Sequence, residues 1–555
     1  MGLTSSAQKI KLALGAHFRA GGQAVTGRVV RLVVRLLAAL SLAPAGAISL
    51  AAQEFQSPPI SAVHVEWRAA LDQLRAELDA APGAASNFTF ASQRRVGAAD
   101  PRSVPALVQL NGITAQIFNG IGRSPIPVLL PFDAGAYFDA QLNGQADRPL
   151  SRYQADFRPV DLFDAGPSGY DAVFSLEAGV GFGMPLRTFA KPVEVQITGS
   201  LLIYDIVDPR GGMGEPVKSL AAQYPDLRRF IREGYVRYAF TKFGVPYVVS
   251  IQCLDSAPRS KRLACREAYP VAERFLKALR IAGGLPTRPR PDIPAQTMDR
   301  PAERSANFTF RAPGDIIAGT GYHRQSGRAD FNAYSQIRFP LEAPAYIHSQ
   351  KRRSGDKADA PNAGFPWRDN FCEARSFSVG QCANGFGHQG EDVRPGACPA
   401  RVEGGCDPRQ QPIFAVRDGV VIRSPKQQAA TLQINSRTEH VRFRYMHMNP
   451  TTMDADGLLN GRQVGEGEKI GVVSNYLDHP NGTSRHLHFD VQVFTRDGWI
   501  WVSPYVTLIS AYERLIRGHG REIGPEIAGA SQPVAHALPE DVIRPDQREG
   551  SSEEN

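Results

Sequence analysis

Half of the histidines in this chain are concentrated in less than a fifth of its length, which constrains the fold more than any other feature. Six of the twelve histidines lie between residues 388 and 488 of a 555-residue chain. Three segments stand out: GHQGED with His388 and Asp392, RYMHM with His447, and RHLHFDV with His486 and His488. Segments so far apart can share one chemical task only if the fold brings them to a single cleft.

The spacing within these segments favours a zinc site. His486 and His488 are two residues apart on a strand-like segment, so they point to one face about 7 Å apart. That distance suits one metal ligand and one neighbour facing the substrate. His388 and Asp392, across a short turn, can supply the other two ligands. Because catalytic zinc takes three protein ligands and a water, we expect a His2Asp site whose water has a pKa lowered toward about 7.

The same segments resemble the LytM/lysostaphin-type zinc metallopeptidases, which cut the peptide part of peptidoglycan. The resemblance covers residues 385–505 and runs, in order, through GFGHQGEDVRPG, PIFAVRDGVVIRS, RYMHM, VGEGEKIGVVSN and RHLHFDVQV. It implies a C-terminal all-β antiparallel sandwich and one Zn²⁺ per chain. It also implies that His388, Asp392 and His488 bind the metal, and that His447 and His486 are the catalytic pair. Independently, the Asp-Gly and Gly-x-Gly turns predict paired strands there.

Three other residues near these segments are expected to have no catalytic role. The chain has no HExxH motif, so the general base of that other metalloprotease class is missing. Glu391, beside Asp392, is expected to face away from the metal. His440 and His479 are expected at the rim of the cleft or on the surface.

The leading interpretation is an exported zinc endopeptidase, a hydrolase of amide bonds in peptidoglycan stem peptides or cross-bridges. The alternative from another class is a non-catalytic LytM-like activator of a separate cell-wall hydrolase. Such regulators usually lack some metal ligands, whereas this chain retains all three and both further histidines. A third interpretation is a peptidase of exported proteins. The bond cleaved and the oligomeric state do not follow from the sequence.

The N-terminus predicts export to the periplasm or cell envelope. The first 53 residues contain six Lys or Arg and no acidic residue, and residues 36–52 form an uncharged, mostly apolar block. This pattern is typical of a signal peptide, with small residues for cleavage after Ala47 or Ala51. The alternative is an uncleaved membrane anchor through residues 28–52. The formal charge of +8 is spread along the chain, so nucleic acid is not an expected partner.

The six cysteines favour disulfides, in agreement with export. No two are spaced as CxxC, which argues against a structural zinc site made of thiolates. Cys253 and Cys265 form one local pair. The other four allow three connectivities, of which Cys372–Cys382 with Cys398–Cys406 is the most economical.

Five segments are expected along the chain. Residues 1–52 are the signal peptide or anchor, and residues 53–283 form an α+β domain of unknown role. A Pro-rich linker occupies residues 284–304, and residues 305–520 form a β-rich region that contains the peptidase core at 385–505. Residues 521–555 are an acidic, disordered tail. In the second segment, Trp67, Leu71, Leu74 and Leu78 predict a helix, as do Val271, Phe275 and Leu279, whereas VEVQITG and YVVSIQC predict strands.

Overall fold

The computed structural model describes most of the chain between residues 55 and 523. The described residues are 55–79, 104–142, 149–176, 189, 192–206, 214–232, 234–253, 263–286, 297–298, 306–314, 333–348, 366–382, 385–396, 411–477 and 479–523. All of them belong to one compact unit. The predicted signal peptide or anchor, Cys398 and Cys406 lie outside these residues. No helix in the described part of the chain is long and apolar enough to cross a membrane.

The N-terminal region, residues 55–286, is built on an antiparallel sheet in the order β4-β5-β6-β11-β10-β9-β8. Its strands are β1 (Phe55–Gln56), β2 (Ile60–Ala62), β3 (Val128–Leu130), β4 (Leu162–Gly166), β5 (Gly169–Ser175), β6 (Glu194–Ser200), β7 (Leu202–Tyr204), β8 (Glu215–Pro216), β9 (Arg228–Arg232), β10 (Tyr235–Lys242), β11 (Val245–Gln252) and β12 (Arg280–Gly283). Its helices are α2 (Trp67–Asp79), α3 (Val104–Thr114), α4 (Ala134–Leu142) and α5 (Tyr269–Ala278), with 3-10 turns η2 (Ile121–Arg123), η3 (Leu150–Tyr153), η4 (Lys218–Leu220) and η5 (Cys265–Ala268).

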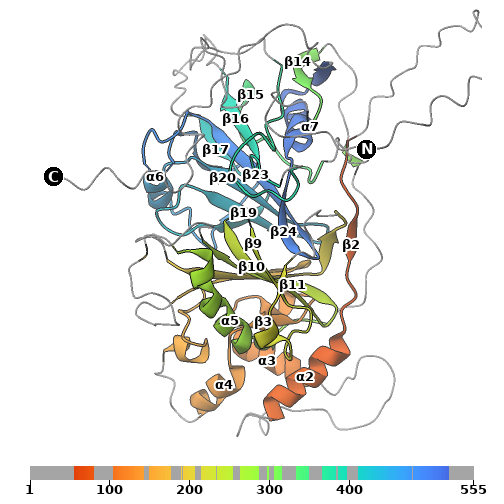
Figure 1. Cartoon of the computed structure of the whole chain (residues 1–555), viewed down its shortest axis with the longest axis vertical. Helices are drawn as coiled ribbons and strands as arrows, with labels where there is room; N and C mark the ends of the chain where they lie inside the picture. Colours follow the sequence, from red (N-terminus) through yellow and green to blue (C-terminus); the bar gives the residue numbers. More distant parts are fainter. Residues whose placement is uncertain are drawn as a thin grey trace, which may run out of the picture. The chain divides into compact units, whose positions relative to one another are not determined.

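Apolar spacing explains the elements of this region. The stripe that begins at Trp67 is buried along α2, because residues three and four apart share one face of a helix. Val195 and Ile197 are buried on β6, as alternation in a strand predicts. The second predicted helix is α5, on which Val271 and Phe275 are buried, but it ends one residue before Leu279. The ring of Phe275 packs against that of Phe174 on β5. Figure 1 shows α5 beside β9, β10 and β11.

The C-terminal region, residues 297–523, is built on a larger antiparallel sheet in the order β15-β16-β23-β20-β19-β18-β21, with β24 also paired to β23 (Figure 1). Its strands are β13 (Thr297–Met298), β14 (Ala306–Arg311), β15 (Ala345–Ile347), β16 (Glu391–Pro395), β17 (Pro412–Phe414), β18 (Gly419–Ile422), β19 (Ala430–Asn435), β20 (His440–Met446), β21 (Gln463–Val464), β22 (Lys469–Val472), β23 (Leu487–Thr495), β24 (Gly498–Val502) and β25 (His519–Ile523). The antiparallel pairing agrees with the sequence. The region is not all β, because it also contains α6 (Pro450–Ala455) and the largely buried α7 (Tyr505–Ile516).

Two segments differ from the sequence prediction. Thr297 and Met298, inside the expected linker, form β13 and pair with β1. Strand β25 continues to Ile523, three residues into the expected disordered tail, and pairs in parallel with β14. The partner strand supplies hydrogen bonds that compensate for the low apolar content of this stretch. The rest of the linker and tail lies almost wholly outside the described residues.

The two regions pack against each other through apolar and charged side chains. Ile203 on β7, Val248 on β11, Phe494 on β23 and Trp499 on β24 form one buried apolar cluster. Beside it, Asp171 on β5 is almost fully buried and contacts two basic side chains of β20. The two sheets therefore share a continuous interior.

Candidate metal centre

Three neighbouring strands bring the predicted site residues together. Asp392 on β16 lies directly opposite His488 on β23 in the antiparallel ladder. Such cross-strand pairs have Cβ atoms about 4.5–5.5 Å apart on the same face. On the other side of β23, His488 is opposite Met446 of β20, and His447 follows at once. His388 precedes β16 by three residues. The fold of this sheet therefore explains why segments a hundred residues apart meet.

His388, Asp392 and His488 converge on a single buried point. His388 Nε2 lies 2.9 Å from His488 Nδ1 and 3.3 Å from Asp392 Oδ1. His488 Nδ1 lies 3.6 Å from the same carboxylate oxygen. Donor atoms bound to tetrahedral zinc at 2.0–2.1 Å are about 3.3 Å apart. The three separations therefore fit one zinc ion, and these residues form a group with metal-binding spacing in the described part of the chain.

The second nitrogen of each ligand imidazole is directed at an acceptor. His388 Nδ1 donates to the backbone carbonyl of Asn370 at 3.0 Å, and His488 Nε2 faces Asp490 Oδ2 at 3.3 Å. The lone pairs of the other two nitrogens then point at each other and at the Asp392 carboxylate. Such a convergence is unfavourable without a cation between the groups. Metal-binding histidines commonly show this outer contact, which fixes the tautomer.

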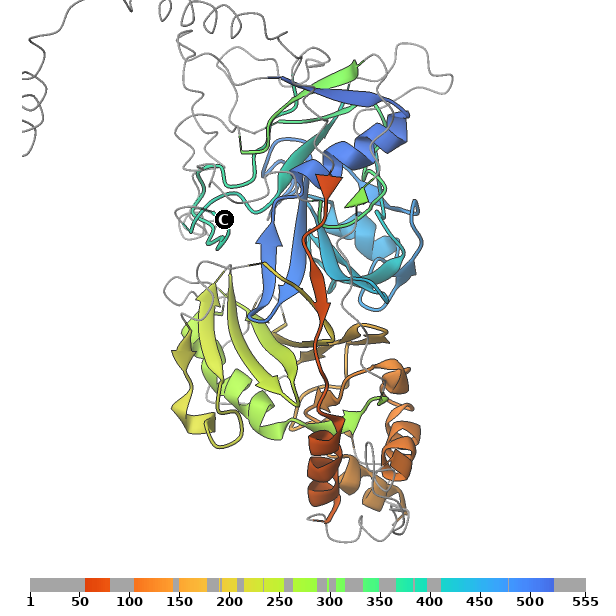
Figure 2. The same ribbon diagram turned by 90° about the vertical axis from the view of Figure 1, so that its right-hand side faces the viewer.

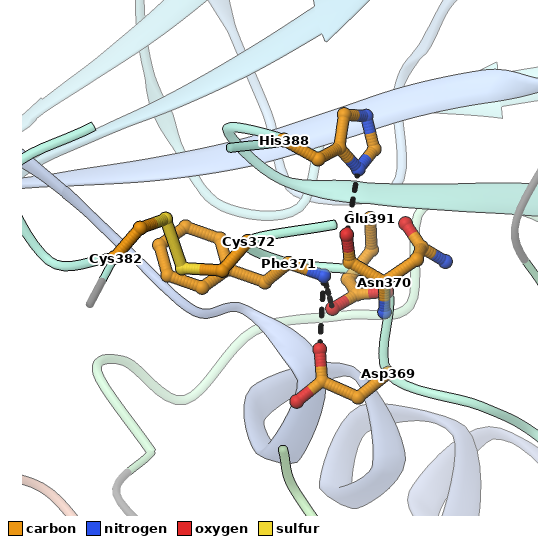
Figure 3. Close-up of a disulfide and its surroundings, with 7 residues drawn as sticks. All are labelled: Asp369, Asn370, Phe371, Cys372, Cys382, His388 and Glu391. Carbon is orange, nitrogen blue, oxygen red and sulfur yellow. Dashed lines mark hydrogen bonds between the residues drawn. A yellow bond between two sulfur atoms is a disulfide. The ribbon is translucent and has the colours of Figure 1, made fainter. Parts of the chain in front are cut away.

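Asn370 holds both His388 and Asp392 in place. Its carbonyl oxygen accepts from His388, and its side-chain Oδ1 accepts from the backbone N–H of Asp392 at 3.0 Å. Figure 3 shows Asn370 below His388, with Phe371 between Asn370 and the Cys372–Cys382 disulfide, which closes the loop leading to the ligand. Gly390 allows this loop to join β16, because a Cβ there would lie 2.3 Å from the carbonyl oxygen of Phe489.

Both expected disulfides that lie in the described residues are present. Cys253 bonds to Cys265, and Cys372 bonds to Cys382. The first joins the end of β11 to η5, as expected from the sequence. The second lies beside the candidate metal centre (Figure 3).

His447 and His486 lie beside the three ligands with their rings 4.6 Å apart. His447 Nδ1 donates to the carbonyl of Tyr476 at 3.0 Å, and His486 Nδ1 donates to that of Ser484 at 2.7 Å. The Nε2 atom of His447 is therefore the one left for chemistry, whereas that of His486 faces the Asp392 carboxylate. His447 has a φ of 68°, a left-handed conformation that is costly outside glycine and concentrates at functional sites.

The separation of about 7 Å that a flat strand predicts for His486 and His488 does not apply at this site. His486 precedes β23 and joins Ser474 in an isolated bridge, so the chain is not a regular strand at that point. His486 Nε2 consequently lies 3.3 Å from Asp392 Oδ1, as near as His388. Proximity to the carboxylate alone does not separate a ligand from a catalytic neighbour.

Burial controls the charge of the site. It lowers the pKa of His388 to about 4 and that of His447 well below its ordinary value. Burial alone would raise the pKa of Asp392, but the imidazoles of His388 and His486 lower it well below 3.8. Burial alone would lower the pKa of His488, but Asp392 and Asp490 raise it. His388 and Asp392 therefore have the neutral and anionic states that zinc binding requires, whereas zinc would have to displace a proton that the two carboxylates favour on His488.

Asp490 lies behind the metal ligand His488, next to its Nε2 atom. The sequence analysis did not identify this residue. Its Oδ2 accepts from Arg444 at 2.7 Å, and its Oδ1 accepts from the indole of Trp501 at 2.9 Å. Burial alone would raise the pKa of Asp490, but Arg444 lowers it. The carboxylate thus stays charged next to His488. Asp490 follows His488 by two residues on one strand, so the i, i+2 rule could have identified it.

Glu391 is buried beneath the ligand loop and accepts backbone N–H groups of Asn370 and Phe371 (Figure 3). Burial, together with nearby Asp369, raises its pKa well above the ordinary value. The Glu391 side chain therefore supports the loop that leads to His388.

His440 is not at the rim of the cleft, whereas His479 is exposed. His440 is fully buried and contacts Ser200 Oγ and Asp171 Oδ2, each at 2.8 Å. These three residues resemble a hydrolytic triad in composition. All three are shielded from solvent between the two sheets, so a substrate has no access to them.

Comparison with known proteins gives little further information. No protein family profile matches the chain, and no curated protein matches it. Among solved structures, it is similar to a protein assigned as the glycyl-glycine endopeptidase LytM from Ruminococcus gnavus. The identity is 20% and the TM-score 0.17, over 24% of this chain and 50% of that one. The chain thus spans half of that structure's length, and a similarity this limited carries no argument about function.

Proposed function

We propose that this chain is an exported zinc endopeptidase that hydrolyses amide bonds in peptidoglycan stem peptides or cross-bridges. The observation that carries the proposal is the convergence of His388 Nε2, His488 Nδ1 and Asp392 Oδ1 on one buried point, with two further histidines alongside. The sequence resemblance supplies the substrate class. The disulfides are compatible with export.

The side chains have distinct tasks in this mechanism. His388, Asp392 and His488 would hold zinc, which when bound polarises a carbonyl and acidifies water. His447 presents an unprotonated Nε2, because its Nδ1–H is engaged by Tyr476 and burial lowers its pKa. It can therefore accept a proton from the attacking water and pass it to the leaving amine. His486 lies beside it and, when its Nε2 as well as its Nδ1 carries a proton, can donate from Nε2 to the carbonyl oxygen on which charge develops.

The test is digestion of purified sacculi by residues 54–555, with the released fragments identified by mass. We expect peptide fragments that show cleavage at one type of amide bond. A chelator should abolish their release, and added zinc should restore it. If the protein binds zinc but cleaves neither sacculi, peptides nor exported proteins, the activator of a separate hydrolase replaces this proposal.

A further inference from the structure

Arg394 lies on β16 at the point where its pairing with β23 stops. The last paired residues are Val393 and Leu487. One more step of the ladder would place Arg394 opposite His486. His486 instead forms an isolated bridge with Ser474, so the two chains separate there. In Figure 2, β23 (blue) begins beside the teal strand β16 and runs toward the yellow-green N-terminal sheet, which places the separation at the end of β23 away from that sheet.

The side chain of Arg394 connects the two chains where the ladder ends. It is only 4% exposed. Its Nη1 donates to the carbonyl of Arg485 at 3.1 Å, and its Nη2 donates to Oγ of Ser484 at 3.3 Å. A guanidinium presents its N–H groups in a rigid planar fork, so one arginine can hold two neighbouring acceptors at once. Ser484 and Arg485 are thereby attached to β16, the strand that carries Asp392.

Ser484 in turn determines how the ring of His486 is oriented. The carbonyl of Ser484 accepts from His486 Nδ1 at 2.7 Å, and its Oγ lies 3.4 Å from the same nitrogen. With Nδ1 held in this way, His486 Nε2 lies 3.3 Å from Asp392 Oδ1. The contacts from Arg394 to Ser484 and from Ser484 to His486 therefore form a continuous path from β16 to the ring.

Contacts on the other side hold the backbone of this segment. The guanidinium of Arg485 donates to the carbonyl of Val473 at 2.7 Å, and the N–H of His486 donates to that of Ser474 at 3.3 Å. Val473 and Ser474 directly follow β22. The segment is thus attached on both sides, and the attachment through Arg394 is the one that reaches the residue holding the imidazole.

We propose that Arg394 is a positioning residue for His486. Its guanidinium holds Ser484 and Arg485 in the irregular path that directs the imidazole into the site. Arg394 acts through these two residues and not on the substrate. The inference rests on the proposed function, from which it takes the catalytic role of His486.

The kinetic test compares Arg394→Gln with Arg514→Gln. Arg514 on α7 is the matched control, because it also donates to a serine hydroxyl, Ser510 Oγ at 2.6 Å, and to a backbone carbonyl, that of Ile337 at 2.8 Å. On sacculi, Arg394→Gln should lower kcat about tenfold, because the imidazole remains present but is no longer fixed. KM and zinc content should stay within about twofold of wild type. Arg514→Gln should leave kcat and KM unchanged.

Chemical rescue distinguishes positioning from a general loss of folding. Guanidinium chloride at about 20 mM, far below denaturing concentrations, should raise the kcat of Arg394→Ala about fivefold, and sodium chloride should not. Arg394→Lys should recover only part of the activity, because an ammonium group is not a planar fork. If wild type cleaves sacculi and Arg394→Gln turns over like Arg514→Gln, the inference is wrong and the proposed function stands. A loss of kcat that comes with loss of zinc and that guanidinium does not restore would also overturn the inference.

Hydrogen exchange tests the inference if wild type releases no fragment, because amide exchange does not require turnover. Peptides covering residues 479–486 include the amides of Thr483 and His486, which donate to the carbonyls of Asn475 and Ser474. These amides should exchange about tenfold faster in Arg394→Gln than in Arg514→Gln. Faster exchange without cleavage of sacculi would support the role of Arg394 in holding this segment although the proposed activity had failed. Equal exchange in the two variants would overturn the inference.

Discussion

The Nε2 atom of His440 on β20 lies 2.8 Å from Oδ2 of Asp171 on β5, and neither side chain reaches solvent. The other oxygen of Asp171 accepts from Arg442 at 2.9 Å and from Thr198 at 2.6 Å. Arg442 also lies over the ring of Trp499. One carboxylate therefore joins the N-terminal sheet to the strand that leads to His447.

We expect Asp171→Asn to lower the free energy of unfolding by about 3–5 kcal/mol, because it leaves Arg442 buried without a counter-charge. The matched control is Asp156→Asn, which breaks an exposed pair with Arg274 and should cost less than about 1 kcal/mol. Urea denaturation at pH 7 measures both. Equal losses in the two variants would contradict a special role for Asp171.

The effect of Asp171→Asn should depend on pH. Burial alone would raise the pKa of Asp171, but His440 and Arg442 lower it below 3.8. Stabilisation by a carboxylate of lowered pKa is present above the ordinary pKa and is lost as pH falls through the folded one. The difference between wild type and variant should therefore be constant from about pH 5 to 7 and shrink below pH 4. Unfolding curves measured across this range check the sign.

Variants of the five site residues should separate into two classes. His388→Ala, Asp392→Ala and His488→Ala each remove one of three anchors, so zinc and activity should be lost together. His447→Ala and His486→Ala should keep close to one zinc per chain while turnover falls about a hundredfold or more. Metal analysis paired with a kinetic assay distinguishes the classes. Loss of metal from His447→Ala, or full activity in all five, would refute these roles.

Asp490→Asn should weaken zinc binding by about 10- to 100-fold without removing a ligand. The change keeps the shape of the side chain but removes the negative charge that faces His488 Nε2. Competition with a calibrated chelator measures the affinity. Gln492→Asn, further along β23, is the control and should bind zinc as wild type does. An unchanged affinity in Asp490→Asn would show that the carboxylate is not part of the metal centre.

The two disulfides should differ in their effect on catalysis. Each closes a short loop, and replacing either pair by serine should cost about 2–3 kcal/mol of stability. Loss of Cys372–Cys382 should also reduce kcat, since that loop holds His388. Loss of Cys253–Cys265 should leave kcat and zinc content unchanged. Thiol titration of the denatured wild-type chain should find almost no free cysteine, and four or more would contradict the disulfide framework.

Sequence patterns identified the parts of the site that depend on local spacing. The spacing within short motifs indicated His388, Asp392 and one of the pair His486 and His488 as ligands, and the family resemblance implied that the third ligand is His488. Asn370 left no such signal, since one of its two contacts uses the backbone carbonyl and it lies 18 residues before His388. Contacts of this kind depend on the path of a loop, which side-chain patterns do not encode.

The misplacement of His440 has a different physical cause. His440, Arg442 and Arg444 alternate with Val441, Phe443 and Tyr445 along β20, a pattern that usually means one face in water. Here the polar face is covered by the N-terminal sheet, whose own polar groups satisfy it. An alternating pattern shows which face of a strand is polar. It does not show whether water or a polar protein surface covers that face.

Strand β23 carries His488 at its start and Phe494, which packs against the N-terminal region, near its end. A gene fragment encoding only the C-terminal region would expose Phe494 and Trp499 and leave the Arg442 guanidinium without Asp171. Such a fragment should be poorly soluble. The N-terminal and C-terminal regions are therefore expected to be expressed and to fold together, as one unit.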